Sequence, residues 1–449
     1  MRILLVQLAD IGDLILTTPA LHALREAQPD AHLTLLTTTH SAPVVEGAGL
    51  VDTIVTLDQT AFDRATAALR PGNLRRLFGL GRCDVVVYFH HFTLRAGTLK
   101  YALIALATGA TRRIGLDNGH GWFLTERLPD GGFGAKHQAQ YWLDLVSLLG
   151  ADPTPRPAQV ARETYPLDSE SPKRVVIHAG GGAYNTARRW NPESFAAVGN
   201  ALHETHGAQI ILVGAQGDDS AAVQPALQDP PLDLTGQTTL PQLADVIAQA
   251  DLFISAESGV MHLASAVGTP VIALFGPGNA EAWGPWNPGG QIVILRSAPE
   301  CSPCSYVGHD LGLRDGCPAR TCMRMIPPAQ VIQAASAILK GQSAAVPPPP
   351  PSRSLAWKNR IRILGLPVDA LTFDGWLELI EQWVNHSRQL ETGPEIHHVC
   401  TINPEFMMIA QQDPNFRHIL QRADLCVPDG VGLLWAARQL GSPLPQRVT

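Results

Sequence analysis

A short polar step between an apolar strand and a helix is the segment of this chain best suited to chemistry. The apolar residues 252–256 run into Glu257-Ser258-Gly259, and a helical pattern follows. The first backbone N–H groups of a helix lack intrahelical partners, and together with the helix dipole they bind phosphate groups. Glycine lets a phosphate approach the backbone closely. The sequence therefore predicts a diphosphate site here, although an ordinary strand–turn–helix unit with Ser258 as its N-cap residue has the same pattern.

Other polar residues lie where further strands are expected to end. Asp13 follows the apolar segment 2–8, and Arg188 lies between a glycine run at 180–182 and an expected helix. A carboxylate could take a proton from an acceptor hydroxyl, and a guanidinium could stabilise a departing diphosphate. Each has a simpler explanation, because helix dipoles favour acids near N-termini and arginines are common surface charges. His262, one helical turn beyond Gly259, could reach a ligand or be a core histidine.

Alternating strands and helices are expected to position these residues. Strands are predicted at 2–8, 32–38, 52–57, 84–90, 174–180, 209–215, 252–256 and 271–276. Helices are predicted near 13–28, 60–78, 94–108, 135–149, 192–206, 239–250 and 328–340. Continuous apolar strands separated by helices indicate parallel sheets covered on both faces, so the fold class is α/β, with domains at 1–150 and 173–340. Because no G-x-G-x-x-G follows a strand, a nicotinamide cofactor has no support.

A proline-rich segment, 341–358, separates a third unit from the rest. Its five consecutive prolines, 347–351, favour an extended, semi-rigid linker. Beyond it, strands are predicted at 362–368, 395–403 and 424–430 and helices at 372–388, 404–420 and 430–440. This α/β domain, 359–449, stops without a closing strand or helix, and we expect it to be incomplete.

The overall composition narrows the function classes. Hydrophobic residues make up 45% of the chain and charged residues 16%, which is typical of a globular protein. A net charge of −7 argues against nucleic-acid binding. No apolar run is long enough to span a bilayer, and Asp10 and Asp13 interrupt the apolar N-terminus, which argues against a signal peptide. With few cysteines, these features favour the cytoplasm, with any membrane contact peripheral, on the inner face of the plasma membrane.

The segment around the diphosphate site resembles the heptosyltransferases (glycosyltransferase family 9), and the resemblance extends over about residues 1–340. The family pattern is (D/N)-(S/T)-G-x-x-H-L-A-A-A-x-G-x-P-x-x-x-L-F-G-P-T. It is matched at Gly259, His262, Leu263, Ala264, Gly268, Pro270, Phe275, Gly276 and Pro277. Glu257 stands where Asp is usual and Gly278 where Thr is usual, which leaves the donor-sugar preference open. The family's G-D-x-(I/L/V)-x-x-x-P-A-L is matched at Gly12, Asp13, Pro19, Ala20 and Leu21.

The resemblance implies the GT-B architecture, in which two Rossmann-like domains face a cleft, and an inverting glycosyltransferase. It implies Asp13 as the base and Arg188 on the donor phosphates. The remaining donor-binding candidates are Gly181, Gly214, Glu257, Ser258, Gly259 and His262, and the acceptor-side candidates are His91, Arg95 and His137. The implied donor is a nucleotide-diphosphate sugar, ADP-heptose by family default, and the acceptor a lipopolysaccharide or other cell-surface glycan. No cofactor or catalytic metal is implied, because arginine and helix N–H groups can stabilise the leaving diphosphate.

The third unit resembles the start of the WecG/TagA/CpsF family (glycosyltransferase family 26). The matching motifs are T-x-N-P-E at 401–405 and P-D-G-V-G at 428–432. The resemblance implies transfer of an N-acetylmannosamine-type sugar from a UDP-sugar to a polyisoprenyl-diphosphate-linked acceptor. Asp429 would be the base, with Thr401 and Asn403 binding substrate, although Asp-Gly is also common turn chemistry. A two-enzyme fusion, a nucleotide-sugar epimerase and a non-catalytic scaffold remain alternatives for the whole chain.

A cysteine-rich stretch lies outside this scheme. Its spacing, C-x2-C-x12-C-x4-C, is formed by Cys301, Cys304, Cys317 and Cys322. Such spacing would suit a tetrahedral structural metal site. Free thiols or a reversible disulfide are the alternatives, and sugar transfer needs none of these.

Overall fold

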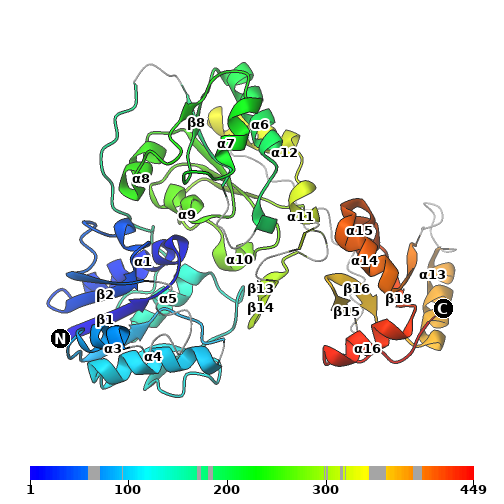
Figure 1. Ribbon diagram of the computed structural model, residues 1–449, viewed down its shortest axis with the longest axis horizontal. Coiled ribbons are helices and arrows are strands. Elements are labelled where there is room, and N and C mark those ends of the chain that lie inside the picture. Colours follow the sequence, from blue (N-terminus) through cyan, green and yellow to red (C-terminus); the bar gives the residue numbers. More distant parts are fainter. Residues whose placement is uncertain are drawn as a thin grey trace.

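The computed structural model describes residues 1–58, 71–93, 95–168, 173–180, 186–297, 299, 302–313, 317–318, 320–342, 360–387 and 397–448. Within these ranges the chain forms two six-stranded parallel sheets and a smaller C-terminal α/β unit (Figure 1). The expectation of an α/β fold built on parallel sheets is therefore confirmed. Residues 343–358 of the linker predicted at 341–358, and most of the expected helix at 60–78, lie outside the described residues.

The first sheet has the order β3-β2-β1-β4-β5-β6. Its strands are β1 Arg2–Gln7, β2 His32–Thr38, β3 Thr53–Leu57, β4 Val85–Tyr88, β5 Arg112–Asp117 and β6 Glu126–Pro129. The helices are α1 Ile11–Ala27, α3 Pro71–Phe78, α4 Arg95–Thr108 and α5 Gln138–Ser147, with the 3-10 turn η1 Ala42–Val44. Strands β5 and β6 were not predicted from the sequence. Both begin with charged residues, and β6 lies at the sheet edge, so neither shows the continuous apolar run of a central strand.

The second sheet has the order β12-β11-β10-β7-β8-β9. Its strands are β7 Arg174–His178, β8 Gln209–Leu212, β9 Leu232–Asp233, β10 Leu252–Ala256, β11 Val271–Leu274 and β12 Ile292–Leu295. The helices are α6 Pro192–His206, α7 Ser220–Val223, α8 Leu240–Ala248, α9 Gly259–Ala266, α10 Ala280–Trp283, α11 Thr321–Arg324 and α12 Pro328–Leu339, with 3-10 turns η3 Thr186–Arg188 and η4 Gln224–Ala226. A hairpin, β13 Ser305–Val307 and β14 Asp310–Gly312, projects from this half.

The two sheets have the same doubly wound topology. In each, the strand order reverses beside the first strand of the half: between β1 and β4 in one sheet, and between β7 and β10 in the other. Ligands of such sheets bind at this switch point, outside the carboxyl ends of the strands. The topology therefore directs attention to the residues that follow β1, β4, β7 and β10.

Helix α1 joins the two halves. It packs against α5 of its own half and against α9 of the other (Figure 1). One apolar core accordingly contains buried residues from both halves, for example Leu21 of α1 and Met261 of α9. Burial of this apolar surface stabilises the contact between the halves.

The C-terminal unit departs from expectation in two places. Its elements are β15 Arg360–Ile363, β16 Leu366–Asp369, α13 Phe373–Ser387, β17 Val399–Ile402, α14 Pro404–Gln412, α15 Pro414–Gln421, β18 Leu425–Pro428 and α16 Val431–Gln439. The single strand predicted at 362–368 is wrong, because the chain reverses at Leu364 and Gly365, both with positive φ, to make an antiparallel hairpin. The single helix predicted at 404–420 is also wrong. It breaks at Asp413, since Pro414 has no N–H to continue it.

Among the described residues, no helix has both the length and the apolar character needed to cross a bilayer.

Candidate active site

The first turns of two helices, one from each half, meet at the centre of the molecule. A Cβ added to Gly12 of α1 would lie 2.8 Å from Cδ2 of His262 and 3.4 Å from Cα of Gly259, both on α9. Helix α1 follows β1 and α9 follows β10, so each helix starts at the switch point of its sheet. This contact brings Asp13 and the predicted diphosphate site together.

Asp13 has the properties of a base that works near neutral pH. Burial, reinforced by the nearby Asp10, raises the pKa of the Asp13 carboxyl to about 6, although Trp283 and Arg188 act in the opposite direction. The indole Nε1 of Trp283 donates a hydrogen bond of 3.3 Å to Oδ1 of Asp13. A carboxylate with this pKa is ionised at pH 7 yet retains appreciable proton affinity. Asp10 itself is exposed and makes no side-chain cap to α1.

Ser258 is the N-cap residue of α9. Its Oγ accepts a hydrogen bond of 3.3 Å from the N–H of Met261 and lies 3.2 Å from Nδ1 of His178, at the end of β7. Nε2 of His178 lies 3.7 Å from Oδ2 of Asp218. Burial lowers the pKa of His178 to about 4, so its ring is neutral at pH 7. These polar groups hold the start of α9 at the sheet's switch point.

Gly214 makes room for Asp218. A Cβ at Gly214 would lie within 1.9 Å of Oδ2 of Asp218, and the Gly214 φ of 154° is one that glycine adopts readily. Asp218 in turn accepts hydrogen bonds from the N–H groups of Ala215 and Ser220, at 3.0 and 2.8 Å. Gly214 therefore shapes the loop after β8, and its contact with a nucleotide stays a prediction.

Arg188 and Glu257 form an ion pair beside the start of α9. Nη1 of Arg188 lies 3.0 Å from Oε1 of Glu257. Burial raises the pKa of Glu257, although Arg188 and Arg296 oppose the rise. Oε2 of Glu257 is buried and has no hydrogen-bond partner among the described residues. Since a buried unsatisfied acceptor is costly, a ligand hydroxyl at this position would be stabilising. The neighbouring Arg189 pairs instead with Asp219, at 3.1 Å.

His262 is a buried, neutral imidazole. Burial, then the charges of His137 and Arg188, lower its pKa to about 3. Its Nδ1 is buried and, within the described ranges, has no hydrogen-bond partner. The side chain is packed like a core histidine, and its contact with a donor stays a prediction.

Two of the three acceptor-side candidates, His91 and His137, have structural partners. His91, after β4, has Nδ1 3.0 Å from Oδ1 of Asp130 and Nε2 2.9 Å from Oε1 of Gln138. His137 caps α5 by accepting from the N–H of Ala139, and its Nε2 donates to the carbonyl of Gly284 across the boundary between the halves, at 2.9 Å. Arg95 begins α4, and its side chain lies outside the described part of the structure. Contact of these residues with an acceptor stays a prediction.

The candidates in the C-terminal unit lie at one edge of its parallel strand pair. Asn403 caps α14 by accepting from the N–H of Phe406, at 2.8 Å, and Thr401 is exposed at the end of β17. The N–H of Asp429 donates to the carbonyl of Ile402, at 2.7 Å. This hydrogen bond joins the ends of β17 and β18 and brings Asp429 close to Asn403, and contact of the three candidates with substrate stays a prediction. Oδ1 of Asp429 lies 3.9 Å from Nε of Arg447.

Two predicted features fall partly outside the description. Gly181 is one of the residues not described. In the cysteine stretch, Cys301 is not described, and Cys304, Cys317 and Cys322 form no disulfide among the described residues. The described ranges contain no group of three or more His, Cys, Asp or Glu side chains arranged to hold a metal ion.

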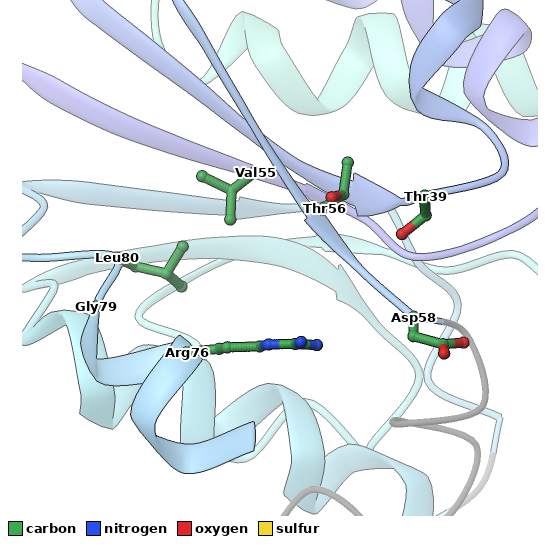
Figure 2. Close-up of a pocket in the computed structure, with 7 residues that line it drawn as sticks. All are labelled: Thr39, Val55, Thr56, Asp58, Arg76, Gly79 and Leu80. Carbon is green, nitrogen blue, oxygen red and sulfur yellow. The ribbon is translucent and has the colours of Figure 1, made fainter. Parts of the chain in front are cut away.

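Sequence reasoning missed an open cavity in the first half. It has a volume of about 550 Å³ and is lined by Thr39, Val55, Thr56, Asp58, Arg76, Gly79 and Leu80. Figure 2 shows Arg76 extending from α3 below strand β3, with Asp58 at the strand's end. Thr39 and Asp58 follow β2 and β3, so one end of this space reaches the carboxyl edge of the sheet. In the sequence, the polar residue that follows each of β2 and β3 could have indicated this cavity. Sequence reasoning likewise missed Trp283, His178 and Asp218.

Comparisons with known proteins agree with the fold. Residues 91–311 match the family model "Glycosyltransferase family 9 (heptosyltransferase)", and residues 361–449 match "Glycosyl transferase WecG/TagA/CpsF family". Lipopolysaccharide heptosyltransferase 3 of Escherichia coli is 28% identical over 297 residues, which cover 62% of this chain and 84% of that protein.

Two solved structures share the two-sheet fold. A glycosyl transferase of family 9 from Veillonella parvula superposes with a TM-score of 0.60 at 23% identity, covering 76% of this chain and 97% of that one. The E. coli ADP-heptose lps heptosyltransferase II has a TM-score of 0.56 at 19% identity, covering 76% and 99%. These likenesses confirm the GT-B architecture predicted for the first two domains.

Proposed function

We propose that residues 1–340, of which residues 91–311 match the glycosyltransferase family 9 model, transfer heptose from ADP-heptose to a lipopolysaccharide acceptor. This match and that of residues 361–449 to the WecG/TagA/CpsF family model support glycosyltransferase activity for the chain. The donor is inferred from the E. coli structure named for ADP-heptose and the acceptor from the E. coli relative named for lipopolysaccharide. Contact with a lipid-linked acceptor would be peripheral, at the inner face of the plasma membrane.

The observation that carries this proposal is the contact between the starts of α1 and α9. It sets a carboxyl with a pKa of about 6, Asp13, beside the N–H groups that begin at Gly259. Transfer from a nucleotide-sugar needs a base for the acceptor hydroxyl and a group that stabilises the leaving diphosphate. The acceptor oxygen and the leaving diphosphate must also be held in line. The two halves of the chain supply one requirement each.

The proposed reaction is a single displacement. The acceptor oxygen forms a bond to the anomeric carbon while Asp13 takes its proton. The bond between that carbon and the diphosphate oxygen breaks, and the nucleoside diphosphate leaves with the electron pair. Arg188 and the α9 N–H groups stabilise the negative charge that develops. One displacement inverts the configuration at the anomeric carbon.

Calorimetric titration with ADP, UDP, GDP and ADP-heptose tests the donor assignment. We expect ADP and ADP-heptose to bind best, and Arg188→Ala to weaken both by about tenfold or more, the magnitude of a charge-assisted hydrogen bond. Arg189→Ala is the matched control, because it removes the adjacent guanidinium, which pairs with Asp219. Binding of UDP-sugars that survives Arg188→Ala would move the activity to the C-terminal unit or to an epimerase. A protein that binds no nucleotide would support the scaffold alternative.

A second transfer reaction is proposed for the C-terminal unit. The family match over residues 361–449 and the meeting of Asn403 and Asp429 at one strand edge favour it. The reaction would move an N-acetylmannosamine-type sugar from a UDP-sugar to a polyisoprenyl-diphosphate-linked acceptor. UDP-N-acetylmannosamine turnover that Asp429→Asn abolishes and Asp13→Asn leaves intact would assign it. Turnover equally sensitive to Asp13→Asn would contradict it.

A further inference from the structure

The tryptophan that hydrogen-bonds Asp13 comes from the other half of the molecule. Trp283 ends α10, and the two hydrogen-bonded residues are 270 positions apart in the sequence. The bond joins Nε1 of the indole to Oδ1 of the carboxylate, at 3.3 Å. The proposed base therefore belongs to the first half, while a group that orients its carboxylate belongs to the second.

Trp283 is itself held in place by its surroundings. Its ring centroid lies 5.0 Å from that of Phe133, in the first half, and 4.8 Å from that of Tyr306, on the hairpin. Asn279 caps α10 by accepting from the N–H of Glu281 and also donates to the carbonyl of Tyr306, at 2.9 Å. A ring packed against two aromatic neighbours has few rotamers, so its N–H is presented to Asp13 at low entropic cost.

We propose that Trp283 is a positioning residue for glycosyl transfer, which fixes the Asp13 carboxylate across the boundary between the two halves. The inference rests on the proposed function, because it takes Asp13 as the base. A hydrogen bond to an ionised carboxylate stabilises that form, so the indole favours the proton-accepting state of Asp13. It also makes the state of the base depend on how the halves are docked.

Other titratable groups lie near Asp13. Asp10 lies at the start of its own helix, Arg188 belongs to the turn after β7, and His262 of α9 packs on the adjacent Gly12. His137 of the first half interacts electrostatically with His262. A substitution at Trp283 leaves all four groups in place, so a change in the titration of Asp13 would report the indole hydrogen bond itself.

Nuclear magnetic resonance of the full chain, labelled with ¹⁵N-tryptophan, tests the contact without an assay of activity. We expect the Trp283 indole N–H signal, assigned by its loss in Trp283→Phe, to shift with pH around a midpoint of about 6. The shift should disappear in Asp13→Asn. A Trp283 signal that stays constant from about pH 5 to pH 8, across the Asp13 titration, would overturn the proposal.

Kinetics then test the positioning role. The assay measures release of ADP from ADP-heptose, with de-O-acylated, heptose-deficient lipopolysaccharide as the acceptor. In Trp283→Phe, whose ring still fills the aromatic site, we expect kcat to fall about tenfold with KM for ADP-heptose nearly unchanged. The acidic limb of the pH profile should move up by about half a pH unit, because loss of the donor raises the pKa of Asp13.

Trp286→Phe is the matched control. Trp286 also crosses between the halves, stacking on His137 and donating to the carbonyl of Arg156 at 2.9 Å, but Asp13 is not its partner. We expect it to leave the pH profile unchanged. Equal displacement of the acidic limb by both variants, or displacement by neither, would overturn the positioning role. Full activity in Asp13→Asn would instead refute the base assignment, and so the proposed function.

Discussion

A Cβ atom on Gly278 would lie only 1.7 Å from Oε2 of Glu257. Glu257 follows β10 and Gly278 follows its neighbour β11, so the two residues meet at adjacent strand ends. They are also the two positions at which the chain departs from the Asp and Thr of the heptosyltransferase pattern. The longer glutamate occupies the space that a threonine side chain would need. The two departures are therefore one structural change.

This coupling predicts that Gly278→Thr is harmful alone and tolerated with Glu257→Asp. The single change displaces the Glu257 carboxylate from Arg188, and overpacking costs about 1–3 kcal/mol of unfolding free energy. The double variant removes the clash, so its loss should be smaller than the sum of the single losses. Thermal unfolding and the Kd for ADP-heptose measure both effects. Additive losses in the double-mutant cycle would show that the two positions are independent.

Asp13 should reduce stability at the pH where it acts. Its pKa rises from 3.8 in the unfolded chain to about 6 in the folded protein, so the folded state binds more protons between these values. Stability therefore falls as pH rises through this window, by up to about 3 kcal/mol. Asp13→Asn removes the penalty. We expect the variant to unfold at a higher temperature than the parent at pH 7.5, but at the same temperature near pH 4.

The opposite result, an Asp13→Asn protein less stable than the parent at pH 7.5, would mean that the carboxylate is stabilised by its surroundings. Ser265→Ala, in α9 and away from the carboxylate, provides a control whose stability difference from the parent should not vary with pH.

The sequence was informative where chemistry depends on strand ends and uninformative where it depends on distant loops. Asp13 and Glu257-Ser258-Gly259 each follow an apolar strand, and parallel sheets bring such residues to one edge. Trp283 could not be predicted, because nothing in its local pattern indicates that the chain brings it onto Asp13. Asp218 likewise resembles an ordinary turn residue until His178 and Gly214 are seen beside it. Contacts between loops of different halves depend on how the halves pack.

The C-terminal unit shows the same limit on a local scale. Residues 362–368 contain enough apolar positions for one strand, but Leu364 and Gly365 adopt positive φ and reverse the chain. Arg360 is then able to pair with the buried Asp369, at 2.6 Å. This ion pair across the hairpin, rather than local propensity, accompanies the observed register.

Gly12→Ala should separate activity from stability. Alanine is favoured over glycine within a helix by about 1 kcal/mol, so α1 itself should not be weakened. The new Cβ would lie 2.8 Å from Cδ2 of His262 and push α1 away from α9. Because small misplacements of reacting groups are costly, we expect kcat to fall by about tenfold or more. ADP should still bind, since the α9 N–H groups are unchanged. Wild-type kcat in this variant would show that the close contact is not required.

The cavity beside β3 makes a prediction about the acceptor. Arg76 is its only lining cation among the described residues, and a guanidinium binds carboxylate or phosphate groups in a two-pronged manner. Since the cavity belongs to the half that supplies Asp13, we predict that it holds an anionic part of the acceptor. Arg76→Ala should raise the KM for the lipopolysaccharide acceptor by about tenfold, the magnitude of a charge-assisted hydrogen bond, while leaving the Kd for ADP-heptose unchanged.

Arg75→Ala is the matched control for this prediction. Arg75 lies on the same helix, is exposed, and does not line the cavity. The two variants carry the same net charge, so a general electrostatic attraction for the acceptor would be weakened equally in both. A selective effect of Arg76→Ala that high salt reduces would indicate direct binding in the cavity, because salt screens an exposed ion pair. Equal effects of the two substitutions would assign the loss to long-range charge and leave the cavity without a role in acceptor binding.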